Sequence, residues 1–374
     1  MNIAANPNMS WEERLPMQLR SLYRSYGYQI YKMSDFETYD LYRENKNFLS
    51  DNNVLTFTDI DGRLMALKPD VTISIAKDTK PEELTRKLFY SEHVFRRIPG
   101  NNQFTEIKQM GLEYIGADTG YAEAEVISLA CQSLAAINKE YFLGISHMGY
   151  ISALMAALAV DDTVQESLLQ AIRRKSSGDI SIALQDIRLD ERQNNAIYSL
   201  INLPPALDDA LTQMKAAALN DDMLKAISEL EAVFSACEVW GLKPWLRMEL
   251  SLLNDLEYYN GIVFQGYIKG LPRAVLSGGR YDKLLQRFGK SQPALGFALY
   301  LNDIWGAFVQ PKDYDIDTLL LYSEESPAQV ALAVQQVVSA GQSVLAAKAI
   351  PTDISARQVV QLAEILDTKE KDKC

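Results

Sequence analysis

The stretch FRRIPGNNQFTEIKQMGLEYIG, residues 95–116, decides how the rest of the chain is interpreted. Its second half alternates like a β-strand, because Met110 and Leu112 lie on one face and polar residues lie on the other. The apolar face predicts contact with a hydrophobic core. Together with the residues before it, the stretch predicts two strands, 87–96 and 106–116, around the loop IPGNNQFT.

The polar face of the second strand predicts a ligand site. Gln109 and Glu113 stand on either side of Gly111, which has no side chain. Residues four apart in a strand lie roughly 13 Å apart, so these two side chains would border a small polar ligand above Gly111. A carboxylate at position 113 would attract an ammonium or imidazolium group. The same pattern also fits a half-exposed edge strand, and these residues alone leave both interpretations open.

Size and composition are typical of a globular protein with two or three domains. The chain has 374 residues, of which 48% are hydrophobic and 23% charged. No apolar run approaches the ~20 residues that span a bilayer, and the first residues do not resemble a signal peptide. Three widely spaced cysteines, Cys131, Cys237 and Cys374, favour a reduced, cytoplasmic protein over a disulfide framework.

The net charge argues against a polyanion as the main partner, and the scarcity of histidines argues against a metal site. The net charge is −12, from 49 acidic and 37 basic residues, which favours small molecules and proteins as partners. The chain has two histidines, His93 and His147, far apart in the sequence, so we expect no metal site and no metal cofactor.

The order of predicted elements indicates a mixed antiparallel α+β domain. Helices are expected at residues 11–27, 35–42 and 121–137 and from near Val71, and strands at 28–31, 54–58, 64–67 and 142–146. At the start of the helix near Val71, Asp70 or Thr72 is suited to cap the backbone, a role compatible with ligand contact. Residues 150–240 are rich in alanine and leucine at helical spacing and predict a helical insertion.

The last part of the chain, residues 313–374, predicts a separate small α/β unit. Its expected strands are 318–322 and 343–347, and its expected helices are 328–340 and 356–366. The main domain is accordingly placed at residues 1–310.

Several common catalytic signatures are absent from the sequence. It contains no GxxxxGK[ST] loop, no GxGxxG after a strand, no HExxH and no GxSxG. Gly278, Gly279 and Arg280 resemble part of a phosphate-binding turn, although a tight strand-to-helix turn explains them equally simply.

Four segments resemble histidyl-tRNA synthetase and its paralogues among the class II synthetases. They are LKPDVT at 67–72, FR at 95–96 with QMGLEYIG at 109–116, LEYYNG at 256–261, and GGRYD at 278–282 with PALGFA at 293–298. The resemblance covers roughly residues 11–310. It implies an antiparallel sheet flanked by helices, a homodimer, and a C-terminal unit that is a shortened anticodon-binding-like domain.

The resemblance also implies which residues surround bound histidine. Carried over position by position, they are Asp70, Thr72, Gln109, Glu113, Tyr258 and Tyr259. Residual phosphate or ligand contacts would come from Arg96, Gly278, Gly279 and Arg280.

The residues that handle ATP in the family are largely replaced here. The departures are Ile98 for a glutamate, Asn102-Gln103-Phe104-Thr105 for the loop arginines, Asn254 and Asp303 for two further arginines, and Ser34 for the motif 1 proline. Losing one group that stabilises transition-state charge costs ~10²–10³ in rate, and about four are missing. At 4 Å and an effective dielectric of 20, a like-charge pair costs about 4 kcal/mol, so Asp303 is expected to repel a triphosphate. We therefore expect no catalytic residues and no amino-acid activation.

Such a combination resembles the catalytically inert branch of the family, the regulatory subunits of ATP phosphoribosyltransferase in histidine biosynthesis. That resemblance implies L-histidine as ligand and the short catalytic phosphoribosyltransferase subunit as partner, in a hetero-oligomer without tRNA. The C-terminal unit agrees, since residues 313–374 carry 10 acidic and 5 basic residues, a poor surface for tRNA. A divergent histidyl-tRNA synthetase and a stand-alone histidine sensor, or a paralogue that modifies another protein, remain as alternatives.

Overall fold

The computed structural model describes residues 9–49, 54–82, 84–97, 103–116, 120–253, 258–308 and 314–365. Its contacts define two compact units, one spanning Leu19–Ala307 and another that includes the chain from Phe308 onward. The candidate site lies within the first unit, and each unit is described separately below.

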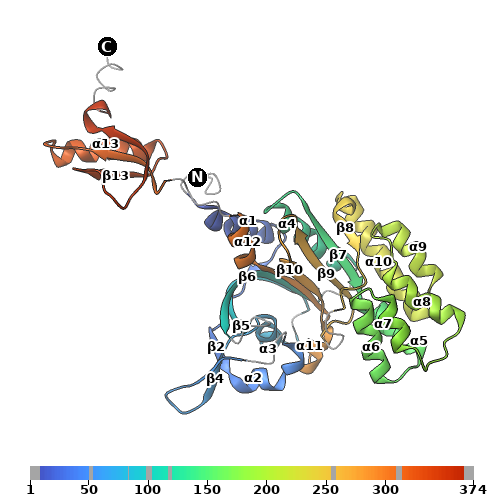
Figure 1. Ribbon diagram of the computed structural model, residues 1–374. Coiled ribbons are helices and arrows are strands. Elements are labelled where there is room, and N and C mark those ends of the chain that lie inside the picture. Colours follow the sequence, from blue (N-terminus) through green and yellow to red (C-terminus); the bar gives the residue numbers. More distant parts are fainter. Residues whose placement is uncertain are drawn as a thin grey trace. The chain divides into compact units, whose positions relative to one another are not determined.

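An eight-stranded sheet forms the centre of the first unit (Figure 1). The strands follow the order β1-β5-β6-β11-β10-β9-β7-β8, and neighbours are antiparallel except the two outermost pairs, β1 with β5 and β7 with β8. Their bounds, in the same order, are Gln29–Ile30, Arg86–Arg97, Phe104–Ile115, Ala294–Tyr300, Leu276–Arg280, Ile262–Ile268, Tyr141–His147 and Leu246–Met248. The mainly antiparallel sheet with flanking helices confirms the expected fold class.

The hairpin of β5 and β6 confirms the predicted strand alternation. Tyr90 pairs with Gly111 and Leu88 with Glu113, so these side chains share one face of the sheet. Met110 and Leu112 point to the other face and are fully buried. Gln109 and Glu113 are also buried, and β6 lies between β5 and β11, which excludes the interpretation of a solvated edge strand.

Helix α4, Gly120–Ala135, covers the face of the sheet to which Met110 and Leu112 point. Helix α1, Trp11–Ser25, contributes Tyr23, whose ring lies 5.9 Å from Phe89 and 6.2 Å from Phe297. The buried carboxylate of Glu125 on α4 accepts a 2.7 Å hydrogen bond from Lys87 of β5, which attaches the helix to the sheet.

The opposite face carries a smaller layer. Its elements are β2 (Phe36–Thr38), α2 (Tyr39–Glu44), a 3₁₀ helix (Lys46–Phe48), β3 (Thr56–Thr58), β4 (Leu64–Leu67), α3 (Thr72–Asp78) and α11 (Asp282–Arg287). The strands form an antiparallel sheet in the order β2-β4-β3. Ala66, Ile73 and Leu284 belong to the buried cluster that joins this layer to the large sheet.

Six helices fill the range of the expected insertion (Figure 1). They are α5 (Met148–Leu158), α6 (Asp162–Arg173), α7 (Ser177–Ala183), α8 (Glu191–Ile201), α9 (Leu207–Ala216) and α10 (Asp221–Val239), followed by a 3₁₀ helix at Lys243–Trp245. Side chains of Asp161, Ser176, Asp190 and Asn220 cap four of them by accepting backbone N–H bonds, which explains where these helices begin.

The C-terminal unit corrects one prediction. It contains β12 (Ile316–Leu321), α13 (Pro327–Ser339), β13 (Val344–Ala347) and β14 (Ala356–Gln361), with β12 between the other two strands in a parallel sheet. The expected helix at 356–366 is wrong for residues 356–361, which pair with β12, whereas residues 362–365 are helical. Ala356, Val359 and Val360 have helical spacing, but the β-branched valines lie equally well in a strand beside β12.

Two smaller corrections concern the first unit. Residues 36–38 form β2 rather than the start of a helix, since they pair with β4, and the helix begins at Tyr39. Gly278 and Gly279 lie inside β10 rather than in a turn.

In the part of the chain that the structure describes, no helix combines the length and apolar character needed to cross a bilayer. Helix α12 is Leu301–Phe308.

Candidate functional site

A cavity of about 1160 Å³ opens on the face of the sheet opposite α4. All six residues expected around histidine line it, namely Asp70, Thr72, Gln109, Glu113, Tyr258 and Tyr259. They come from the start of α3, from β6 and from the segment before β9. Arg96 and Gly278 line it as well. The volume lies just above the range of ~300–1,000 Å³ usual for small-molecule sites, so the cavity is larger than a single amino acid.

Glu113 is the central acceptor of the cavity. Its Oε1 accepts a 2.8 Å bond from the Thr72 hydroxyl, and its Oε2 accepts a 2.6 Å bond from the Tyr281 hydroxyl. Among the described residues no lysine or arginine contacts it, and burial raises its pKa to about 8. The carboxyl group therefore lies between two neutral donors in a position where its charge is not compensated by the chain.

Glycine in β11 makes this arrangement possible. Gly296 pairs with Glu113 across the strands, and a Cβ atom at Gly296 would lie 1.9 Å from Glu113 Oε2. Any side chain at Gly296 would displace the carboxylate. Gly111 has a different neighbour, because a Cβ there would lie 2.6 Å from the Tyr90 hydroxyl. Tyr90 therefore fills the space above Gly111 that we expected a ligand to occupy.

Asp70 is engaged by the chain itself. Its Oδ1 accepts a 3.0 Å bond from the backbone N–H of Ile73 in the first turn of α3, and its Oδ2 accepts a 3.1 Å bond from Arg96. Arg96 also donates to the Pro69 carbonyl oxygen at 2.6 Å. The two opposite charges compensate each other at the edge of the cavity, so Asp70 and Arg96 hold the start of α3 against β5.

Gln109 presents an unused donor. Its side chain is 2% exposed, and its Nε2 has no hydrogen-bond partner within the described parts of the chain. An amide N–H buried without an acceptor costs on the order of 1–3 kcal/mol. A ligand with an acceptor atom in this part of the cavity would remove that cost.

Tyrosine rings form one wall of the cavity. The centroids of Tyr258 and Tyr259 lie 4.5 Å apart, and Tyr258 also lies 5.9 Å from Tyr281 and 5.8 Å from Phe48. Burial raises the pKa of both Tyr258 and Tyr259 well above its usual value, so both hydroxyls remain protonated donors. The rings meet edge to face or tilted, and an aromatic wall of this kind suits a flat, partly polar group such as an imidazole.

Comparison with known proteins gives a consistent result. The model of the family described as histidyl-tRNA synthetase matches residues 5–304. An ATP phosphoribosyltransferase regulatory subunit from Moorella thermoacetica is 31% identical over 301 residues, which cover 79% of this chain and 77% of that protein. The chain belongs to the histidyl-tRNA synthetase family, in its branch of ATP phosphoribosyltransferase regulatory subunits.

Solved structures share the fold of this family. A structure described as an ATP phosphoribosyltransferase regulatory subunit/histidyl-tRNA synthetase from Bacillus halodurans has a TM-score of 0.80 and 23% identity, covering 94% of this chain and 93% of that chain. A chain of the ATP phosphoribosyl transferase (HisG:HisZ) complex from Thermotoga maritima has a TM-score of 0.61 and 18% identity, covering 78% and 97%. At these identities the likeness concerns the fold.

An ion pair lies beside the cavity at the start of α12. Asp303 on α12 forms an ion pair with Arg273, which lines the cavity. The ion pair with Arg273 offsets the charge of Asp303, and the expectation that Asp303 repels a phosphate stays a prediction. In the same ion pair, the guanidinium group of Arg273 is already bound to a carboxylate. Among the other replaced positions, the Ser34 hydroxyl oxygen accepts a long hydrogen bond from the backbone N–H of Phe36. Ile98, Asn102 and Asn254 lie outside the described residues.

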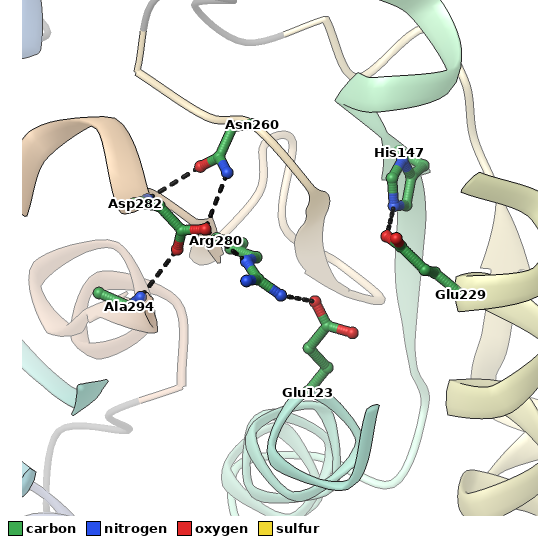
Figure 2. A network of polar contacts seen from close by, with 7 residues as sticks. All are labelled: Glu123, His147, Glu229, Asn260, Arg280, Asp282 and Ala294. Carbon is green, nitrogen blue, oxygen red and sulfur yellow. Dashed lines mark hydrogen bonds and ion pairs between the residues drawn. The ribbon is translucent and has the colours of Figure 1, made fainter. Parts of the chain in front are cut away.

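Arg280 does not belong to the cavity, which corrects its assignment as a ligand contact. Because β10 continues through both glycines, alternation turns Arg280 toward α4, where it donates to Asp282 at 2.8 Å and to Glu123 at 3.4 Å (Figure 2). Asp282 also accepts bonds from Asn260 at 3.0 Å and from the Ala294 N–H at 2.8 Å. These contacts connect the segment after Tyr259 to β10 and α11.

Gly279 is not among the residues that line the cavity either. It lies beneath the Tyr259 ring, since a Cβ at this position would lie 2.8 Å from that ring. Tyr90 and Tyr281 are among the cavity residues that the sequence analysis missed. Tyr281 follows directly on the quoted Gly278-Gly279-Arg280 segment, so its position was visible, but its contact with Glu113 depends on tertiary structure.

Proposed function

We propose that this chain is a non-catalytic regulatory subunit of ATP phosphoribosyltransferase that binds L-histidine in the cavity around Glu113. The observation that carries the proposal is a pair of groups on β6, one without a charge partner and one without a hydrogen-bond partner. Glu113 has no cationic partner among the described residues, and Gln109 Nε2 has no acceptor there. Histidine supplies a cation for Glu113 and a hydrogen-bond acceptor for Gln109, because it carries an ammonium, an imidazole and a carboxylate.

The tyrosines and Thr72 complete the binding site. An imidazole ring placed beside Tyr258 and Tyr259 would exchange hydration for ring contacts, and its N–H would donate to Glu113. Thr72 and Tyr281 already hold the Glu113 carboxylate in place, so little side-chain freedom is lost on binding.

The engagement of the cavity arginines supports a role without catalysis. Adenylation needs fixed cations around the phosphates, since they stabilise the charge of the transition state. Arg96 is bound to Asp70 and to the Pro69 carbonyl, and Arg273 is bound to Asp303. A nucleotide would have to break these contacts before it gained new ones.

Regulation follows if the two states of the complex bind histidine differently. Histidine would then shift the equilibrium between the active and inhibited arrangements of the short catalytic subunit, and coupling would be reciprocal. The naming of relatives as regulatory subunits supports this partner. We include a homodimer in the proposal, because Phe36 and Phe57 lie on an exposed apolar face of the small sheet, with ring centroids 5.6 Å apart.

Isothermal titration with L-histidine, with and without a short-form catalytic subunit, tests the proposal. We expect binding by the wild type, and affinity that changes when the catalytic subunit is present. Glu113→Gln should weaken binding roughly 10- to 100-fold because a charge-assisted bond is lost, and Tyr259→Phe should weaken it up to about tenfold. Both variants should still fold and unfold in one cooperative transition, which shows that weaker binding is not caused by loss of the fold.

Three results would contradict the proposal. They are unchanged histidine affinity in both variants, histidine-dependent ATP–pyrophosphate exchange, which would indicate a synthetase, and failure to assemble with the catalytic subunit, which would indicate a stand-alone sensor. Size-exclusion chromatography of the same mixtures reports the mass of the complex and thereby tests the homodimer.

A further inference from the structure

Helix α6 of the insertion forms a second wall of the cavity. Glu166, Leu169, Gln170 and Arg173 all line it, and their spacing of three, four and seven residues places them on one face of the helix. Leu168, Ala171 and Ile172 are buried within the insertion. The same helix therefore packs into the insertion on one side and presents polar side chains to the cavity on the other.

Arg173 differs from the other arginines that line the cavity in the described parts of the chain. Arg96 forms an ion pair with Asp70, and Arg273 forms one with Asp303. Arg173 donates to the Leu253 carbonyl oxygen at 2.5 Å, and within those parts it contacts no carboxylate. A guanidinium group has five N–H donors, so most of its donors and its full charge remain available.

The end of α6 is attached to the segment that leads to the tyrosine wall. Besides the bond from Arg173 to Leu253, Lys175 forms a 2.8 Å ion pair with Glu249. The backbone N–H of Glu249 donates to the Ile145 carbonyl oxygen of β7 at 2.8 Å. Arg173 is exposed, and these contacts fix the position of its guanidinium beside the cavity.

We propose that Arg173 binds the α-carboxylate of the amino acid while Glu113 and Gln109 bind its other polar groups. The inference rests on the proposed function, because it assigns a further residue to the same ligand. An arginine fork matches a carboxylate with two parallel hydrogen bonds, which gives both orientation and affinity. The bound amino acid then contacts the sheet and the insertion together, so the insertion belongs to the binding site.

Calorimetry with two ligands tests this assignment. L-histidine carries the carboxylate, and histamine has the same imidazole and amine without it. We expect Arg173→Gln to weaken L-histidine binding roughly 10- to 100-fold and to leave histamine binding unchanged. Arg173→Lys should recover part of the loss, since it restores the charge but not the fork.

Arg174→Gln is the matched control. Arg174 is the next residue, is also exposed, and lies 3.8 Å from Asp179 of the insertion rather than in the cavity lining. The Arg174→Gln variant should bind L-histidine and histamine as the wild type does. If Arg173→Gln binds L-histidine like the wild type, or loses both ligands equally, the assignment of Arg173 is wrong and the proposed function stands. If the wild type binds neither ligand, the proposed function fails and this inference fails with it.

Discussion

Two buried glutamates on opposite faces of the same sheet have opposite environments. Glu113, 2% exposed, lies in the cavity, and Glu123, 4% exposed, lies on α4. Glu123 forms an ion pair with Arg280, which also binds Asp282 (Figure 2). Glu113 has two hydroxyl donors and, among the described residues, no cation. The chain compensates the charge at one position and leaves it uncompensated at the other.

This difference separates a structural contact from a binding site. Burying a charge without a partner is costly, so a carboxyl group without one stays protonated to a higher pH. Burial raises the pKa of both groups, and at Glu123 the nearby Arg280 opposes the increase. The uncompensated glutamate is the one that would gain most from a cationic ligand.

The largest effect is expected on the compensated side. Arg280→Met should lower the free energy of unfolding by about 3–5 kcal/mol, because Glu123 would be left as a buried charge without its partner. Denaturation by urea, followed by circular dichroism, measures the loss. Adding Glu123→Gln to this variant should recover part of the stability. Equal stability of Arg280→Met and the wild type would show that the pair carries little energy.

A pH-dependent effect is expected on the cavity side. The pKa of Glu113 is about 8 in the folded chain and near 4.5 when unfolded, so the folded state holds the proton more tightly. Stability from this group is complete below about pH 4.5 and falls as pH rises toward 8, by at most about 1.4 kcal/mol per pH unit. Unfolding of the wild type should show this decline relative to Glu113→Gln in the absence of ligand. Parallel pH profiles of the two proteins would contradict it.

The smallest effect concerns the donors of Glu113. Tyr281→Phe removes one hydroxyl that stabilises the ionised carboxylate, so the pKa of Glu113 should rise further. The expected cost in stability is about 1 kcal/mol near neutral pH, typical of one hydrogen bond. The stability profile should level off at a higher pH than in the wild type. An unchanged profile would mean that burial alone sets the pKa.

Much of the site was predictable because strand alternation is a local property. It placed Gln109 and Glu113 on one face correctly, and the resemblance of four segments brought Asp70, Thr72 and the tyrosine pair to the same cavity. The bonds that define the environment of Glu113 join residues 41 and 168 positions away, and no local pattern indicates them.

The errors have the same origin. Arg280 was assigned to the ligand because the double glycine resembled a turn, but a strand that continues through it turns Arg280 to the other face. The strand at 356–361 was taken for a helix because its apolar spacing suits both, and pairing with β12 decides between them.

The edge strands of the large sheet constrain how this sheet can bind other proteins. In the described chain the two outermost strands, β1 and β8, have two and three residues, and both pair in parallel with their neighbours. Such short edge strands offer few free backbone groups for strand addition by another chain. At this sheet, another protein would therefore be recognised through side chains, so recognition would depend on residue identity rather than on backbone geometry.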